Sequence, residues 1–419
     1  MKIGLDLRCL PADGSPGGGI AHAARALCSR LVLDRSFEWV FYLPIGASFP
    51  LLDKEGLGVV SVIKLDNPSG SSLRRAMREK PCDLSFVPSG AVPLGIGVPA
   101  VPWIHDLIIL DHPEWFPESW LRRQYTTRLV LRGIKRAPVV FAVSEYTKSA
   151  IVRHARIPVE SIVVTGEGGD ETLAGIANDQ LPMTKKRALE FVKNKWHIDS
   201  PFVLALGTVE PRKNLGMLIR AWAKSQDDVG GRRQKEGGRI ELVVAGPWGW
   251  KCEDVKREIA SLPSDLKKLL YRIEKISDDG KRQLLLAASA VAVPSLDEGF
   301  GLVALEALQA GTQVISSNRG AVPEVVGTGA MSLDPLDESA WMTAIVKSSQ
   351  IERPKIFNSV GLAAAVNALK GGPTVIQHSA TVMSAAPIAE SQGVRDAILK
   401  RYSWNLAASA VLDGLKRSV

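Results

Sequence analysis

Short apolar runs of strand length alternate with longer helical stretches through most of this sequence. In the first 170 residues the runs span 2–7, 39–43, 58–63, 83–87, 100–104 and 139–143. The alternation restarts after Pro201, with runs at 202–206, 240–245, 290–293 and 313–316. Strand-length runs separated by helical stretches are typical of a parallel, doubly wound sheet. The sequence therefore predicts an α/β fold with two domains, each built on such a sheet.

A polar segment at 171–186 separates the two regions and leads into a helix-like stretch at 187–193. We place the domain boundary near residue 180, so that the domains span 1–180 and 181–395 and a C-terminal helix, 396–419, crosses back to the first domain. The strand ends of the two sheets are expected to face a shared cleft, which is where open α/β sheets bind ligands. Residues 361–389, rich in Ala, Gly and Ser, are expected to form a surface insertion with one or two helices.

The composition narrows the class of protein. With 46% hydrophobic and 23% charged residues, the chain resembles a folded globular protein and not a disordered one. A net charge of +8 favours acidic partners such as nucleotides, phosphates or an anionic membrane face. The cationic residues form no known nucleic-acid reader motif, so nucleic acid is not expected as a partner. The four cysteines lack Cys-x-x-Cys spacing, which argues against a disulfide scaffold or a zinc site and favours a reducing compartment.

No segment of the sequence is typical of export or of a membrane span. Charges at Lys2, Asp6 and Arg8 interrupt what would have to be an apolar signal region. The uncharged stretch 91–104 contains prolines and is shorter than the roughly 20 apolar residues of a spanning helix. We therefore expect a cytoplasmic protein that does not cross a bilayer.

The most informative segment for function is 294–311, which follows a strand-length run and enters a helix that is apolar almost all round. Glu306 lies on this helix, and burying a carboxylate without a partner costs on the order of several kcal/mol. The vicinal hydroxyls of a ribose would supply two donors to it, and Glu298 in the preceding turn points to the same place. The amides of residues 299–303 are suited to phosphate or sugar hydroxyls. The alternative is a capped helix with a structural salt bridge.

In each domain, the loop after the first strand is a further candidate for phosphate binding. Arg212 and Lys213, in the turn 206–214, offer a bidentate fork and a point charge suited to a pyrophosphate. A solvated basic turn is the alternative. The glycines of 16–20 permit close backbone approach to a phosphate, but the loop lacks the full Gly-x-Gly-x-x-Gly spacing, so a plain flexible loop is equally compatible.

His105 ends a strand-length run, beside Asp106. At a strand end facing the cleft, its ring would hydrogen-bond a sugar or an acceptor hydroxyl. The alternative is a histidine whose ring is satisfied by Asp106. The other histidines have no comparable setting.

Together these segments resemble the glycosyltransferase family 4 enzymes, which are retaining transferases with two Rossmann-like domains, the GT-B architecture. The resemblance covers roughly residues 1–345. Its most specific part is the Glu-x7-Glu segment from Glu298 to Glu306, with its continuations at 311–318 and 323–326. The turn 210–214, the His105-Asp106 pair and the segment 143–145 are also in place.

The resemblance implies a role for each matching residue. The first domain would bind the acceptor and the second the donor, with no metal ion and no cofactor beyond the nucleoside diphosphate sugar itself. The implied roles are ribose binding by Glu306, contacts near the donor sugar by Glu298 and His105, neutralisation of the pyrophosphate by Arg212 and Lys213, closure over it by Gly18 and Gly19, a base contact around Ile276, and further donor contacts by Thr208, Gly299, Phe300, Gly301 and Leu302.

The sequence departs from the family pattern at three places. Many relatives carry an arginine where this chain has Thr208, so Arg212 is expected to take more of the charge. The usual Pro-Asn-Gly segment before the linker is replaced by residues 165–170, Thr-Gly-Glu-Gly-Gly-Asp. The stretch 352–392 is longer than expected.

The resemblance implies transfer of a hexose, with a mannose-type donor favoured, from a nucleoside diphosphate sugar to a saccharide acceptor with retention at the anomeric carbon. No carboxylate stands out as a nucleophile for the opposite sugar face, which favours a same-face displacement. Two alternatives share the architecture: a nucleotide-sugar epimerase and an inactive sugar-nucleotide binding module.

A basic segment at 120–136 bears on the acceptor. It combines six cationic residues with aromatic and aliphatic ones, a composition suited to an interfacial helix on anionic lipid. In that case the acceptor would be a polyprenyl-linked saccharide at the inner face of the cytoplasmic membrane. The alternative is a helix packed on its own domain through Leu121, Tyr125, Leu129 and Leu131.

Overall fold

The computed structural model describes residues 1–15, 17–49, 60–117, 119–199, 201–232, 239–350 and 392–417. The chain forms two compact units. Unit 1 contains residues 1–168 and 402–419, and unit 2 contains residues 169–401. The position near residue 180 that we chose as a boundary lies inside unit 2, next to α7 (Leu181–Trp196).

Unit 1 is built on a parallel sheet with the strand order β3-β2-β1-β4-β5-β6-β7. The order reverses between β1 and β4, as in a Rossmann fold. The strands are β1 (Lys2–Asp6), β2 (Glu38–Pro44), β3 (Val60–Leu65), β4 (Leu84–Val87), β5 (Ala100–Ile104), β6 (Val140–Ala142) and β7 (Ile162–Val164). The helices are α1 (Gly19–Leu31), α2 (Gly70–Glu79), α3 (Ile108–Asp111), α4 (Trp120–Arg136), α5 (Glu145–Ala155) and α17 (Trp404–Arg417).

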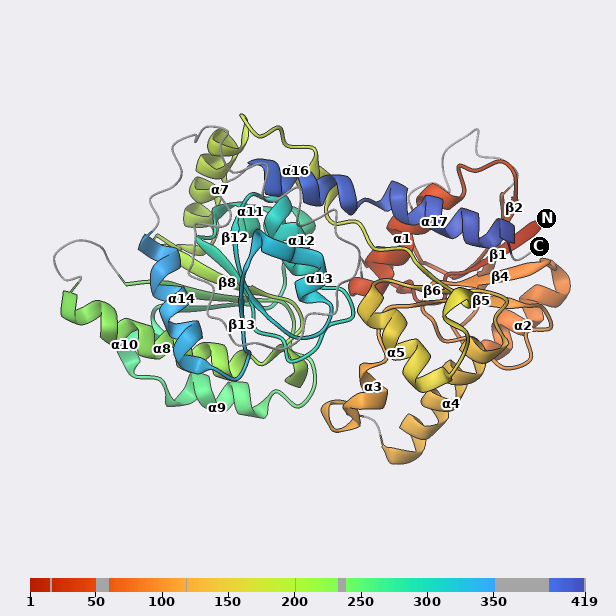
Figure 1. The fold of residues 1–419 in the computed structure, drawn as a ribbon, viewed down its shortest axis with the longest axis horizontal. Coiled ribbons are helices and arrows are strands. Elements are labelled where there is room, and N and C mark those ends of the chain that lie inside the picture. The colour runs from red at the N-terminus through yellow and green to blue at the C-terminus, as the bar shows by residue number, and fades with distance from the viewer. Residues whose placement is uncertain are drawn as a thin grey trace. The chain divides into compact units, whose positions relative to one another are not determined.

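The C-terminal helix completes unit 1. The stretch expected as one helix is two: α16 (Gln392–Arg401) belongs to unit 2, and α17 lies along α1 in unit 1 (Figure 1). Ser403 sits between them, and its hydroxyl accepts a hydrogen bond from the amide of Leu406 at 3.2 Å, as an N-cap does. The expected return of the C-terminal helix to the first domain is confirmed.

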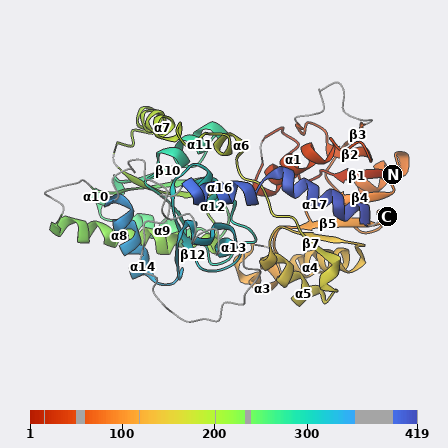
Figure 2. The ribbon, with the colours of Figure 1, turned by 45° about the horizontal axis from the view of Figure 1, so that its top comes forward.

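Unit 2 repeats the same topology, with the strand order β10-β9-β8-β11-β12-β13 and parallel pairing throughout. The strands are β8 (Phe202–Leu206), β9 (Glu241–Ala245), β10 (Leu270–Ile273), β11 (Ala290–Val293), β12 (Gln313–Ser317) and β13 (Met331–Leu333). The helices, besides α7 and α16, are α6 (Glu171–Ala174), α8 (Leu215–Arg232), α9 (Glu253–Ser261), α10 (Ser264–Lys267), α11 (Asp278–Ala287), α12 (Leu302–Gln309), α13 (Val322–Val326) and α14 (Glu338–Gln350). Helices α7 and α11 pack together on one side of the sheet, and α8 and α14 on the other (Figure 2).

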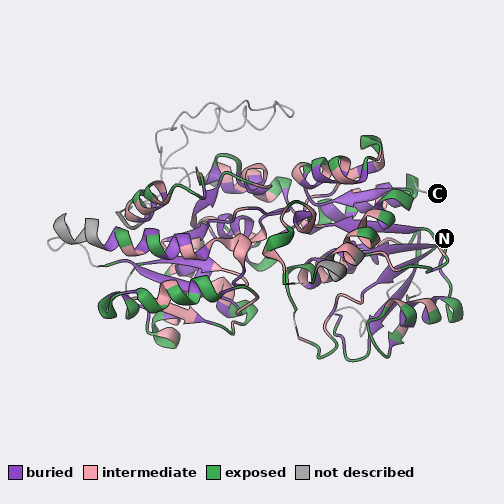
Figure 3. Cartoon of the chain, turned by 90° about the horizontal axis from the view of Figure 1, so that it is seen from below, coloured by how far each residue is buried: buried purple, intermediate pink, exposed green. Residues whose placement is uncertain are grey.

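The cores explain why these runs form strands. Central strands such as β4, β5, β9 and β11 are buried at every position, as expected when helices cover both faces of a parallel sheet. Figure 3 shows buried strands in each unit, with exposed positions on the outer helices. The prediction of two Rossmann-like sheets is confirmed.

Two further expectations concern a surface insertion and the absence of a membrane span. The predicted insertion at 361–389 lies outside the described residues. Among the helices that are described, none is long and apolar enough to cross a membrane.

Candidate active site

The predicted motifs of unit 2 meet at the point where its strand order reverses. Strands β8 and β11 are neighbours in the sheet, and helices leave them toward opposite faces, so the loops after these two strands flank the switch point at which such sheets bind ligands. The loop after β8 carries the basic turn, and the loop after β11 carries Glu298. A hydrogen bond of 2.7 Å from the amide of Leu296 to the carbonyl of Arg212 joins the two loops.

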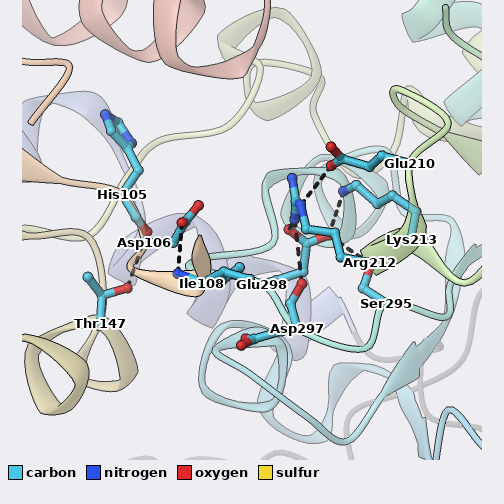
Figure 4. Close-up of polar contacts among 10 residues, drawn as sticks. All are labelled: His105, Asp106, Ile108, Thr147, Glu210, Arg212, Lys213, Ser295, Asp297 and Glu298. Carbon is cyan, nitrogen blue, oxygen red and sulfur yellow. Dashed lines mark hydrogen bonds and ion pairs between the residues drawn. The ribbon is translucent and has the colours of Figure 1, made fainter. Parts of the chain in front are cut away.

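Glu298 is the centre of a buried polar cluster (Figure 4). Lys213 Nζ donates to Glu298 Oε1 at 2.5 Å, and the guanidinium of Arg212 donates to Oε2. Ser295 Oγ also donates to Oε1, at 2.8 Å. The Nε of Arg212 pairs with Glu210 Oε1 at 2.7 Å. The cluster thus holds two cations between two carboxylates, with the cationic side chains fixed by charge-assisted hydrogen bonds.

The two carboxylates of this cluster have opposite pKa shifts. Burial acts to raise the pKa of Glu298, but the charges of Arg212 and Lys213 and the Ser295 hydroxyl outweigh it and lower the pKa to about 2. For Glu210 burial prevails, and its pKa is raised in spite of the same two cations. Glu298 therefore remains ionised and keeps both cations in place.

A small pocket that is open to solvent lies beside this cluster. Gly207, with a φ of +128°, lines it and lets the chain turn away from β8. Thr208 also lines it. The full lining comprises Ala205, Leu206, Gly207, Thr208, Lys213, Leu215, Ala292, Val293, Pro294, Ser295 and Val303.

The turn from Gly299 to Leu302 leads into α12. Gly301 caps this helix with a φ of +102°, a conformation that favours glycine. Phe300 is buried and Leu302 is half-buried. Gly320, on the loop after β12, packs against this turn: a Cβ placed on it would lie 2.6 Å from the amide nitrogen of Glu298.

Glu306 is buried on α12, as predicted, and has a cationic partner. Lys281 Nζ of α11 donates to Glu306 Oε1 at 2.7 Å, with exposed side-chain fractions of 18% and 5%. The structural salt bridge that the sequence left open is therefore present. It does not exclude ribose binding, because a carboxylate has capacity for several hydrogen bonds. Ile276 lies two residues before the start of α11 and is half-buried.

In unit 1, His105 follows β5 and its ring is held by two acceptors. Its Nδ1 lies 2.9 Å from Glu167 Oε1, and its Nε2 lies 2.8 Å from the carbonyl oxygen of Pro88. Asp106, which we considered as its partner, accepts instead from the amide of Ile108 at 3.1 Å (Figure 4). That interpretation of Asp106 is wrong, because the next residue along a strand end points elsewhere.

The glycine-rich loop of unit 1 leads into α1. Gly17 has a φ of +73°, and a Cβ on it would lie 2.8 Å from Ala21 and Pro11. Gly18 caps α1 and Gly19 begins it, and a Cβ on either would meet nothing within 4 Å. The required glycine is therefore Gly17, while Gly18 and Gly19 leave the helix start open on one side.

Several polar partners were missed in the sequence. Lys281, Ser295 and Glu167 were not singled out, although each pairs with a predicted site residue. Ser295 lies only three residues before Glu298, so their contact could have been predicted from the local sequence. Lys281 and Glu167 lie 25 and 62 residues from their partners, so only the fold brings them together. Among the described residues, no cluster of His, Cys, Asp and Glu is suited to a metal ion.

Comparisons with known proteins show which family this chain is similar to. Residues 186–347 match the family "Glycosyl transferases group 1". O-antigen chain mannosyltransferase B of Escherichia coli is 28% identical over 251 residues, which are 60% of this chain and 61% of that protein. The serotype-specific mannosyltransferase WbdA of Escherichia coli is 26% identical over 250 residues, 58% of this chain and 29% of that protein. Each match thus spans less than two thirds of the relative.

Among solved structures, that of the Anabaena protein HepE in complex with UDP-glucose is similar, with a TM-score of 0.67 over 100% of both chains at 18% identity. At this identity the likeness shows the fold, which is that of the GT-B proteins.

Proposed function

We propose, from the premise that this chain belongs to the glycosyl transferases group 1 family, that it is a retaining glycosyltransferase. It transfers a hexose from a nucleoside diphosphate sugar to a hydroxyl of a saccharide acceptor, in polysaccharide or glycan biosynthesis. The observation that carries this proposal is the pair of cations, Arg212 and Lys213, fixed by Glu298 beside an open pocket at the switch point of unit 2.

The chemistry requires positive charge at the leaving group. The bond between the anomeric carbon and the phosphate oxygen breaks, and negative charge grows on the departing diphosphate. Lys213 supplies a point charge and Arg212 a planar fork, both preorganised by Glu298, so little reorganisation is needed when the charge develops. The acceptor oxygen bonds to the same face of the sugar, and the departing phosphate takes the acceptor's proton. The anomeric configuration is therefore retained.

The remaining donor contacts are assigned from the family resemblance. Glu306 binds the ribose and shares its carboxylate with Lys281. His105 contacts the reacting sugar. Further contacts come from Gly18, Gly19, Thr208, Ile276, Gly299, Phe300, Gly301 and Leu302.

The test compares two lysines of unit 2. Lys213→Ala removes a cation of the cluster, and Lys224→Ala removes an exposed lysine of α8 that pairs with Glu338 at the surface. We expect Lys213→Ala to lower hexosyl transfer by about 100-fold or more, the usual effect of losing one preorganised charge-stabilising group. Lys224→Ala should leave transfer unchanged. Full transfer in Lys213→Ala, or inversion at the anomeric carbon of the product, would contradict the proposal.

A mannose-type sugar is the proposed donor. The names of the two E. coli relatives, both mannosyltransferases, support it. Incubation with a panel of uridine, guanosine and adenosine diphosphate hexoses identifies the donor by heat stability, because a ligand at 100 times its Kd adds roughly 2.7 kcal/mol. A rearranged donor without acceptor would indicate an epimerase, and binding without any turnover would indicate an inactive module.

Helix α4 supports an acceptor at an anionic membrane surface, on its cytoplasmic side. Its exposed cationic side chains follow the spacing of one helical face, while Ile134 is buried in the core of unit 1. Leu129 and Leu131 are half-buried, and the side chains of Leu121 and Tyr125 lie outside the description. The exposed residues are Arg128, Arg132, Lys135 and Arg136.

Vesicle co-sedimentation tests this location. Exchanging Arg132 and Lys135 for glutamine should weaken binding to anionic vesicles by about 30-fold, since each such charge contributes about 1 kcal/mol near the surface. Binding that does not depend on anionic lipid would contradict the membrane location and leave the proposed transfer reaction intact.

A further inference from the structure

The ring of His105 is enclosed by hydrogen-bond acceptors. Nδ1 faces Glu167 Oε1 at 2.9 Å, and Nε2 faces the carbonyl oxygen of Pro88 at 2.8 Å. A carbonyl oxygen and an ionised carboxylate accept hydrogen bonds and do not donate them. Both ring nitrogens must therefore carry a proton for both contacts to be hydrogen bonds. This arrangement is complete only when His105 is a cation.

Because His105 and Glu167 are both largely buried, their pairing has a strong effect on the pKa of His105. The side chain of His105 is 13% exposed and that of Glu167 is 3% exposed. Burial alone acts to lower the pKa of His105, because it penalises the charged ring. The hydrogen bond and the charge of Glu167 outweigh burial, and the pKa of His105 is raised.

The other groups around the ring contribute less. Asp106, the next residue, is exposed; it adds a weaker attraction, and its carboxylate is engaged with the amide of Ile108. Helix α5 contributes the hydroxyl of Thr147, which donates to the backbone carbonyl of His105 and carries no charge. The indole of Trp103 packs beside the ring, with centroids 4.4 Å apart.

Glu167 is itself fixed by the segment that departs from the family pattern. Thr165 Oγ1 accepts from Trp103 Nε1 at 3.0 Å, which ties the segment to β5. Gly166 turns the chain with a φ of +66°. A Cβ on Gly168 would lie 2.6 Å from the indole of Trp404, so the backbone there is pressed against α17. The Glu167 carboxylate therefore reaches the ring from a backbone anchored on both sides.

We propose that Glu167 is a positioning residue that holds His105 as an imidazolium in one orientation, so that the ring keeps a fixed positive charge for the sugar contact assigned to it above. The contribution to transfer rests on the proposed function, whereas the pairing of Glu167 with His105 does not. The segment 165–170 thereby acquires a role that the usual Pro-Asn-Gly sequence would not supply.

Glu167→Gln tests this role, because glutamine keeps the shape of the side chain and its accepting oxygen but removes the charge. The His105 ring is titrated by NMR, with its signals identified by their loss in His105→Asn. We expect the titration midpoint of His105 to fall by about 1 to 3 pH units, the usual effect of removing an adjacent opposite charge. The alkaline limb of the kcat profile should move to lower pH by the same amount, with transfer recovered at acidic pH.

Two variants serve as controls. Asp111→Asn neutralises the partner of a second histidine in unit 1, His154, which lies 2.9 Å from it. It should leave the titration of His105 and the kcat profile unchanged. Glu167→Asp keeps the charge on a shorter side chain, so the midpoint of His105 should stay above that in Glu167→Gln while kcat falls at every pH.

The outcomes are separable. An unchanged His105 midpoint in Glu167→Gln, with the fold retained by circular dichroism, would overturn the proposal. So would a shifted midpoint with an unmoved kcat profile. If the His105 midpoint falls in Glu167→Gln but the wild-type protein transfers no hexose, the pairing is supported and the proposed function is overturned.

Discussion

At the scale of single residues, the charges of the candidate site are arranged in matched groups. Glu298 holds Arg212 and Lys213, and Lys281 holds Glu306. Each group lies in a site that is largely removed from water, where an unpaired charge would be costly. The loss of one partner should therefore affect stability as well as binding.

Glu298→Gln should make the stability of unit 2 depend less on pH. The pKa of Glu298 is about 2 in the folded chain, below its ordinary value of 4.5. A depressed pKa contributes stability above pH 4.5 that is lost as the pH falls toward 2. At neutral pH we expect the free energy of unfolding to drop by about 3 kcal/mol, at about 1.4 kcal/mol per pKa unit. Urea unfolding of both proteins from pH 2.5 upward measures this, and a difference that is constant with pH would contradict it.

Lys281→Met should leave Glu306 buried beside an apolar side chain. Removing one partner of a buried ion pair costs about 3 to 5 kcal/mol, and the partial exposure of Lys281 places this case at the lower end. Adding Glu306→Gln should recover part of the loss, because the uncompensated charge disappears. A double-mutant cycle on thermal unfolding measures the coupling, and additive effects would show that the two side chains do not support each other.

At the scale of elements, the loops after β8 and β11 are set in place by their backbones. Gly320 has a φ of +66°, and a Cβ on it would lie 2.6 Å from the nitrogen and 2.8 Å from the carbonyl oxygen of Glu298. The loop after β12 thus buttresses the turn that carries Glu298. A side chain at this position would displace that turn.

Gly320→Ala should reduce hexosyl transfer by at least about 10-fold, because misplacement of reacting groups by even 1 Å is costly. Gly327→Ala is the control: its φ of +50° also disfavours alanine, but a Cβ there meets nothing within 4 Å. Both variants should lose stability from the backbone strain, and only Gly320→Ala should lose activity. Equal activity in the two variants would show that the clash has no effect on the site.

The sequence was informative where elements are buried. The runs at 202–206 and 290–293 coincide with β8 and β11 because these central strands are apolar along their length. The strands that we did not predict, β7, β10 and β13, are short and lie at or toward sheet edges. In β10 and β13 polar residues such as Arg272 and Ser332 interrupt the apolar pattern, since an edge strand is only partly covered.

The positions of the main site residues could be predicted from the sequence, but their contacts could not. Glu298, Arg212 and Lys213 could be located because functional loops follow strand ends in this fold. Their mutual ion pairs, and the partners Lys281 and Glu167, depend on distances across the fold that no local spacing encodes.

At the scale of the whole molecule, the chain leaves unit 1 after Gly168, builds unit 2, and returns at Tyr402 to finish unit 1. The returning helix α17 buries Trp404, Val411 and Leu415 in unit 1. Unit 1 is therefore assembled from the two ends of the sequence, and its stability depends on residues that follow unit 2.

Trp404→Ala should destabilise unit 1 and spare unit 2. The indole is 2% exposed, so its loss should cost about 3 to 5 kcal/mol. Leu406→Ala, at a site 48% exposed on the same helix, should have little effect. Hydrogen exchange should show faster exchange in β1 and α1 for Trp404→Ala and unchanged protection in β8. Equal loss of protection in β8 would show that the two units unfold together.

The central claim is that an activated sugar binds at the switch point of unit 2. The most direct test is a crystal structure of the protein with an intact nucleoside diphosphate hexose bound. We predict that the diphosphate lies within hydrogen-bond distance of Lys213 Nζ or the Arg212 guanidinium, with the ribose at Glu306. A donor bound at another place in the molecule, with Arg212 and Lys213 contacting only Glu210 and Glu298, would contradict the account.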